Sequence, residues 1–124
     1  MNFVVLEKKY AIYKFSHETD LPDWVYSSDF YSITRTKDEL SVVAVQIEDI
    51  PAEIPYNSAW RILKIAGPLA LSITGIIADI ADIFKNYNIP IFTISTYDTD
   101  YIMIKEKDLD SGLNALRKNG HNVT

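Results

Sequence analysis

The chain has 124 residues, which allows one compact domain or two very small units that share a core. Its 12 Lys and Arg against 17 Asp and Glu give a net charge of −5, so nucleic acid is not an expected partner. The absence of cysteine excludes disulfides and thiol chemistry. The longest apolar segment, residues 69–84, is interrupted by Asp79 and Asp82, so we expect no membrane span. The apolar start at residues 3–6 is too short for a signal peptide, and we expect a cytoplasmic protein.

Two segments carry helical patterns. In residues 73–87 apolar side chains recur three or four positions apart and form a broad stripe, which predicts an amphipathic helix that Ser72 or Thr74 can cap. A shorter helix is predicted over residues 108–119, with acids in its first turn, bases in its last, and Gly120 as the terminating residue.

Four strand-like segments surround these helices, at residues 60–66, 91–95, 101–105 and 121–123. The order is therefore β-α-β-β-α-β. This order predicts an α+β fold of the ferredoxin-like type, in which both helices cover one face of a four-stranded sheet.

The first half of the chain resembles part of the second half. Residues 30–43 align with residues 91–104, and each stretch contains a strand, a polar turn and a returning strand. We interpret the first half as a degenerate copy in which residues 10–15 form the first strand and residues 22–26 a shortened helix. Residues 3–7 would add an edge strand. The alternative is chance, because any two antiparallel hairpins share an apolar-polar-apolar pattern.

Two segments of the second half carry candidate binding groups. The turn at residues 96–100 holds two carboxylates and two threonine hydroxyls, which can receive the ammonium group of a free amino acid and donate to its carboxylate. The segment 66–72 leads into the predicted helix, where unpaired backbone amides can hold a carboxylate. Each segment also has a purely structural interpretation, since Asp and Thr commonly form turns and Gly67-Pro68 commonly ends a strand.

The sequence shows no apparatus for catalysis. His17 and His121 have no partner at metal-ligand spacing, so no metal site is predicted. No nucleophile motif and no glycine-rich phosphate loop is present, so we expect neither a cofactor nor an enzyme. Asp98 and Asp100 are read as solvated turn acids rather than as an acid-base pair.

Three stretches together resemble the ACT-domain family. They are residues 36–43 (TKDELSVV), residues 60–69 (WRILKIAGPL) and, most specifically, residues 91–104 (IFTISTYDTDYIMI). More narrowly, the chain is similar to small stand-alone proteins with two ACT units, related to the regulatory regions of aspartate kinases and to cytosolic arginine sensors. The resemblance implies a degenerate N-terminal ACT-like unit over residues 1–57 and an ACT domain over residues 58–124.

The resemblance also implies a function. ACT units are regulatory and bind a small effector, most often an amino acid, and we expect a homodimer. In this hypothesis Asp100 receives the effector's ammonium group, Thr96 orients it, and amides near residues 69–72 hold its carboxylate. The alternative is an assembly or protein-interaction module whose effector site is vestigial. The effector-binding residues that the resemblance implies are Ser95, Thr96, Asp100, Gly67, Pro68, Leu69 and Ser72.

Overall fold

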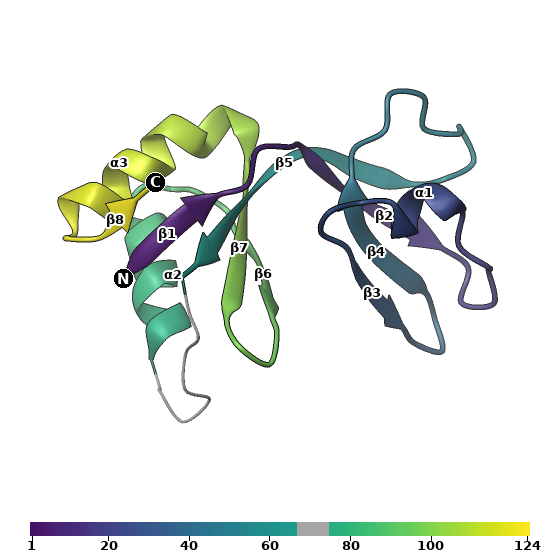
Figure 1. Ribbon diagram of the computed structural model, residues 1–124, viewed down its shortest axis with the longest axis horizontal. Coiled ribbons are helices and arrows are strands. Elements are labelled where there is room, and N and C mark those ends of the chain that lie inside the picture. Colours follow the sequence, from purple (N-terminus) through teal and green to yellow (C-terminus); the bar gives the residue numbers. More distant parts are fainter. Residues whose placement is uncertain (67–74) are drawn as a thin grey trace. The chain divides into compact units, whose positions relative to one another are not determined.

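The computed structural model describes residues 1–66 and 75–124, and these residues form two compact units (Figure 1). The N-terminal unit comprises residues 8–59, and the C-terminal unit comprises residues 1–7 together with residues 60–124. Strand β5 (Tyr56–Ile65) begins in the N-terminal unit and continues into the C-terminal one. Ala59, the last residue of the N-terminal unit, has a left-handed backbone with φ of 63°, and its amide donates to the Gln46 side chain at 2.7 Å.

The N-terminal unit is a small antiparallel sheet with one short helix. Its elements are β2 (Tyr10–Phe15), α1 (Asp23–Tyr26), β3 (Ser32–Arg35) and β4 (Leu40–Val45), and β4 lies between β3 and β2. Within residues 46–55, all of them described, no helix follows β4. The hydroxyl of the buried Tyr13 donates to the Val45 carbonyl at 2.9 Å and accepts from the Ile47 amide at 3.2 Å. Burial raises the pKa of Tyr13, an effect that the Ile47 hydrogen bond partly opposes.

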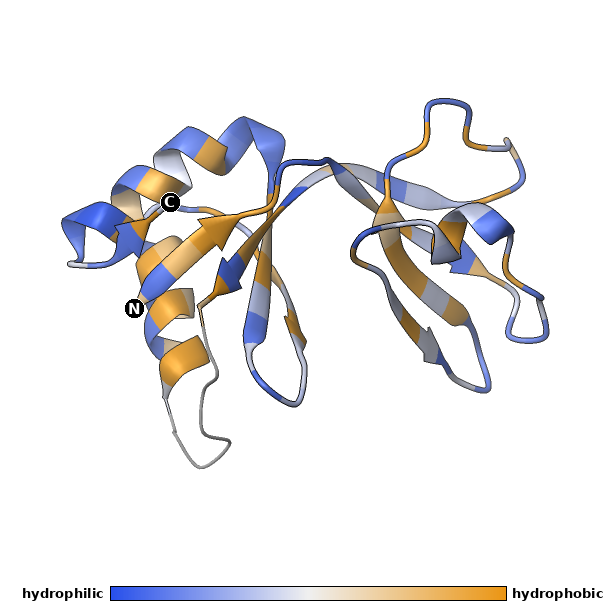
Figure 2. Cartoon of the chain, in the orientation of Figure 1, coloured by the Kyte–Doolittle hydropathy of each residue, from blue (hydrophilic) through white to orange (hydrophobic). Residues whose placement is uncertain are grey.

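In its described residues, the C-terminal unit has a five-stranded sheet covered by helices. Its strands lie in the order β6 (Phe92–Ser95), β7 (Asp100–Lys105), β5, β1 (Asn2–Val5) and β8 (Asn122–Val123). The helices are α2 (Ile76–Asn86) and α3 (Leu109–Lys118), the latter entered through the 3-10 turn η1 (Glu106–Asp108). Figure 2 shows the apolar residues spaced along α2 as an amphipathic helix requires. The core joins Leu63 and Ile104 of the sheet with Ile80 and Phe84 of α2 and Leu116 of α3.

The predicted ferredoxin-like α+β order is confirmed, with β5, α2, β6, β7, α3 and β8 following one another along the chain. The predicted helix start at residue 73 and its caps Ser72 and Thr74 lie outside the described residues. The first strand differs from the prediction, because β1 is not an edge strand of the first half. It pairs with β5 and, in parallel, with β8, so that residues 1–7 fold with the second half. Burial of Phe3 in the core of the C-terminal unit explains this placement.

The two hairpins close with the same turn. The Thr36 amide donates to the Glu39 carbonyl at 2.9 Å, and the Thr96 amide donates to the Thr99 carbonyl at 2.8 Å. The strand pairs before these turns, Arg35 with Leu40 and Ser95 with Asp100, match as well. Residue 36 therefore corresponds to residue 96, and the sequence alignment, which set residue 36 against residue 97, was wrong by one position.

His121 makes the stability of the C-terminal unit dependent on pH. The Met1 amino group donates to its Nδ1 at 3.0 Å, and the ring packs edge-on against Phe3. Partial burial and the nearby amino-terminal charge lower the pKa of His121 below its ordinary value of 6.5. The folded state therefore binds this proton less readily than the unfolded state, and stability falls as the pH drops below about 6.5. The variant His121→Asn keeps an acceptor for the Met1 amino group but cannot bind this proton. Between pH 5 and 7 its urea midpoint should therefore vary less with pH than that of the parent protein.

Candidate functional site

The β6–β7 turn brings together the three predicted site residues that the structure describes. Ser95 and Asp100 are cross-strand partners at the end of the hairpin, and the Ser95 hydroxyl donates to the Asp100 carboxylate. Thr96 begins the turn between them. Tyr97 and Asp98 at its tip are exposed, Tyr97 by 83%. Ser95, Thr96 and Asp100 therefore present one carboxylate and two hydroxyls within a single turn.

The Thr96 hydroxyl is already used in holding the turn. It donates to the Thr99 carbonyl at 3.1 Å and accepts from the Thr99 amide at 3.3 Å. A hydroxyl has one hydrogen and two lone pairs, so Thr96 has one acceptor position left and no hydrogen to donate. Towards a ligand it can therefore receive a hydrogen from an ammonium group, but the prediction that it also donates to a carboxylate is wrong.

Thr99 fixes this turn against the end of β5. Its side chain is 6% exposed, and its hydroxyl donates to the Ile65 carbonyl at 2.6 Å. Ile65 is the last residue of β5, which leads towards the segment 67–74. The sequence placed the Thr99 hydroxyl among the binding groups of this turn, and that part of the prediction is wrong, because a threonine in a polar turn gives no sign that it will be buried.

The other predicted binding residues lie in that segment. Gly67, Pro68, Leu69 and Ser72 are outside the described residues, and the amides proposed to hold a carboxylate are among them. The Thr99 hydrogen bond does place the turn and the strand that leads into this segment side by side within one chain.

The N-terminal unit supplies an internal comparison for this turn. The Thr36 hydroxyl donates to the Glu39 carbonyl at 3.3 Å and accepts from the Glu39 amide at 3.1 Å, as Thr96 does with Thr99. The positions of Ser95 and Asp100 are occupied there by Arg35 and Leu40. The turn therefore forms without the Ser95–Asp100 pair, so this pair is not needed to build the hairpin.

The charge around Ser95 and Asp100 indicates which ligand groups this pair can bind. In the part of the chain that the structure describes, Asp100 forms no ion pair with a Lys, Arg or His. A carboxylate with an acceptor hydroxyl beside it suits a cationic hydrogen-bond donor such as a primary ammonium group.

The two histidines do not contribute to this turn. His17 Nε2 lies 3.5 Å from a carboxylate oxygen of Glu18 on the surface, and His121 contacts Met1. Among residues 1–66 and 75–124, no group of three His, Cys, Asp or Glu side chains could hold a metal ion. No helix within the same ranges is long and apolar enough to cross a membrane.

Models of known protein families match both units of the chain. A family model described as an ACT domain matches residues 56–118, and a second model, described as an N-terminal domain, matches residues 8–53. A solved structure of an Agrobacterium tumefaciens protein is 32% identical, with a TM-score of 0.89 over 99% of this chain and 91% of that one.

Aspartate kinases share the fold at lower identity. The regulatory subunit of aspartate kinase from Thermus thermophilus is 14% identical, with a TM-score of 0.61 over 91% of this chain and 93% of that one. Aspartate kinase from Clostridium acetobutylicum is 12% identical, with a TM-score of 0.65 over 92% of this chain and 33% of the kinase. At such identities the likeness concerns the fold alone.

Proposed function

The chain belongs to the ACT-domain family, and from this premise we propose that it is a regulatory protein that binds an amino acid and has no catalytic activity of its own. The effector site would be the β6–β7 turn together with the segment 67–72. Any regulated activity would then lie outside residues 1–124.

One observation carries this proposal: the Ser95–Asp100 pair is present in one hairpin and replaced in the other, although both turns have the same hydrogen bonds. A feature that the fold does not require is available for binding. Asp100, half-buried and without a cationic partner among the described residues, would accept the α-ammonium group.

The other residues have supporting roles in this proposal. Ser95 would hold the Asp100 carboxylate in position, and Thr96 would accept a second hydrogen from the ammonium group. Backbone amides near Leu69 and Ser72, which precede α2 in the sequence, would hold the effector's carboxylate. Gly67 and Pro68 would shape the approach to these amides.

A melting screen with the twenty amino acids tests the proposal. A ligand that binds only the folded protein stabilises it by about 2.7 kcal/mol at a hundredfold excess over its dissociation constant, so binding should appear as a raised melting temperature. If none of the twenty raises the melting temperature at millimolar concentration, amino-acid binding is rejected.

A second candidate function is assembly, and strand β6 favours it. Within the described residues β6 pairs with β7 alone, so one side of β6 is a sheet edge in the C-terminal unit. Its sequence, Phe-Thr-Ile-Ser, contains neither the charge nor the proline that commonly protects an edge, and Phe92 is 37% exposed. Pairing of two β6 edges would give a homodimer.

A lysine in β6 is expected to break such a dimer. The variant Thr93→Lys adds a charge at an exposed position of the edge, and it should weaken self-association by about tenfold or more while changing the melting temperature little. Light scattering across a concentration series measures this. Thr34→Lys, an exposed position on β3 of the N-terminal unit, is the matched control. A parent protein that stays monomeric at high concentration would contradict the assembly function.

A further inference from the structure

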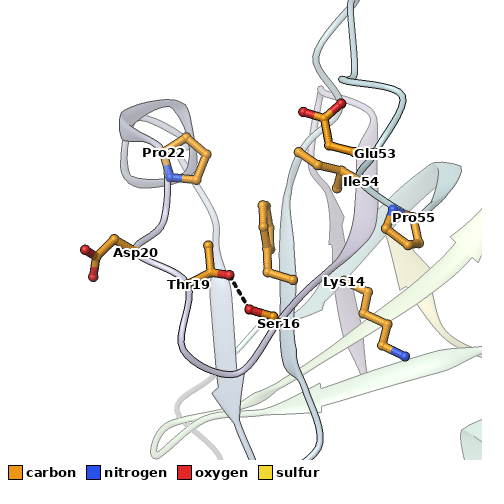
Figure 3. Close-up of a pocket in the computed structure, with 9 residues that line it drawn as sticks. Lys14, Ser16, Thr19, Asp20, Pro22, Glu53, Ile54 and Pro55 are labelled. Carbon is orange, nitrogen blue, oxygen red and sulfur yellow. Dashed lines mark hydrogen bonds between the residues drawn. The ribbon is translucent and has the colours of Figure 1, made fainter.

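The N-terminal unit contains a cavity of about 500 Å³ (Figure 3). Its lining comes from two segments: the end of β2 with the loop that follows it, and the segment just before β5. Pro22 and Thr19 lie on one side and Ile54 and Pro55 on the other. All of these residues belong to residues 8–59, so the cavity is complete within this unit.

Hydrogen bonds hold one wall of the cavity in place. The Thr19 amide donates to the Ser16 carbonyl at 3.0 Å, and the hydroxyls of these two residues are 2.8 Å apart. From strand β3, the Arg35 guanidinium donates to the His17 carbonyl and, at 3.4 Å, to the Thr19 carbonyl. The Arg35 side chain of β3 thereby helps to hold the loop in place.

The opposite wall is fixed in the same way. The Lys14 amide of β2 donates to the Pro55 carbonyl at 3.0 Å, and the Ile54 amide donates to the Pro51 carbonyl, also at 3.0 Å. Proline rings at positions 22 and 55 add stiffness, because their backbone φ is restricted. Both walls are thus formed before any ligand arrives, which reduces the ordering cost of binding.

No helix follows β4 in the N-terminal unit, and part of the irregular segment that stands there lines the cavity. In the C-terminal unit α3 packs Leu116 onto the sheet, whereas in the N-terminal unit Ile50 and Ile54 of an irregular segment pack on the core. Phe15, at the end of β2, lines the cavity and is 8% exposed.

The lining of the cavity is mostly apolar, and polar side chains lie at its two ends. Phe15, Pro22, Ile54 and Pro55 supply the apolar surface. Figure 3 shows the Ser16–Thr19 hydroxyl pair at one end and Glu53 beyond Ile54 at the other. The charged ends of Lys14 and Asp20 point away from the other lining residues.

We propose that this cavity binds a small primary amine with a compact apolar body. The apolar body would lie between the proline and isoleucine side chains, and the ammonium group would pair with the Glu53 carboxylate at the rim. A free amino acid fits less well, because its own carboxylate would come close to Glu53 while Lys14 points elsewhere. The inference does not depend on the amino-acid site proposed for the C-terminal unit.

Titration of the ¹⁵N-labelled full chain with phenethylammonium tests the proposal. Amide resonances of Ser16, Thr19 and Ile54 should shift in a saturable way. The variant Glu53→Gln should weaken binding by about fivefold, the upper end for an exposed ion pair. Asp20→Asn, which removes the lining carboxylate that points away, should leave the affinity unchanged.

Phenylalanine and 2-phenylethanol serve as matched ligands with the same ring. Weaker binding of both at the cavity supports the assignment of the ammonium group to Glu53. Equal binding of phenylalanine at the cavity, an unchanged affinity in Glu53→Gln, or no shift of the cavity resonances at about 10 mM phenethylammonium would each overturn it. Shifts confined to the β6–β7 turn would overturn it as well, while leaving the effector site in the C-terminal unit standing.

Discussion

The variant Asp100→Asn is expected to bind the amino-acid effector between about tenfold and a hundredfold more weakly than the parent protein. A hydrogen bond to a charged group contributes about 1.5–3 kcal/mol, and asparagine keeps the shape of the side chain while removing the charge that attracts an ammonium group. Isothermal titration with the amino acid selected by the melting screen measures the loss. The empty protein should melt nearly as before, because the Ser95–Asp100 contact is an exposed one.

Two variants serve as controls for this result. Asp98→Asn removes the other carboxylate of the same turn, which is exposed at its tip, and Asp38→Asn alters the corresponding position of the first hairpin. Neither should change the affinity by more than about twofold, because both carboxylates are exposed to water, where a charge interacts weakly with a ligand. Equal affinities of Asp100→Asn and the parent would remove Asp100 from the site.

Replacing Gly112 with valine is expected to destabilise the C-terminal unit by about 3 kcal/mol. Gly112 is buried in α3, and a Cβ atom there would lie 2.8 Å from Cδ1 of Ile104 and 3.3 Å from Cε1 of Phe84. Both of those side chains are fully buried, so they have little room to move. Valine has a slightly better helix propensity than glycine, but this advantage of a few tenths of a kcal/mol is much smaller than the cost of overpacking.

Each unit has one tryptophan, which allows the effect to be located. Trp60 is in the C-terminal unit and Trp24 in the N-terminal one. In a Trp24→Phe background, urea unfolding followed by Trp60 fluorescence should show the loss from Gly112→Val. The control Asn114→Val, at an exposed position of the same helix, should cost less than about 0.5 kcal/mol. A loss below about 1 kcal/mol in Gly112→Val would mean that Ile104 and Phe84 move aside easily.

Local patterns in the sequence predicted most of the elements. The apolar stripe located α2, because this pattern needs only neighbours along the chain. Comparison of the two halves of the chain placed β2 at its observed bounds. The short helix α1 also lies where a shortened copy of the first helix was expected. Strand β1 was assigned to the wrong half, because its hydrogen bonds join it to residues about 60 and 120 positions away.

The candidate site was predictable in part. Ser95, Thr96 and Asp100 stand close together in the sequence, and a hairpin brings cross-strand partners together from local pairing alone. That Thr96 has no hydrogen left to donate, and that Thr99 anchors the turn on Ile65, follow from the conformation of the backbone. The correspondence between the two hairpins likewise follows from the hydrogen bonds of their turns. The sequence alignment of these hairpins was wrong by one position.

The sequence by itself determined the α+β class, the order of the strands and helices, and the residues of the polar turn, because periodicity and turn chemistry act over a few residues. The tertiary structure alone decided three further features: the entry of β1 between β5 and β8, the burial of Thr99, and the cavity beside Phe15. Each of these depends on contacts between segments far apart in the chain, and such contacts form only when apolar burial and hydrogen-bond pairing are satisfied together across a whole unit.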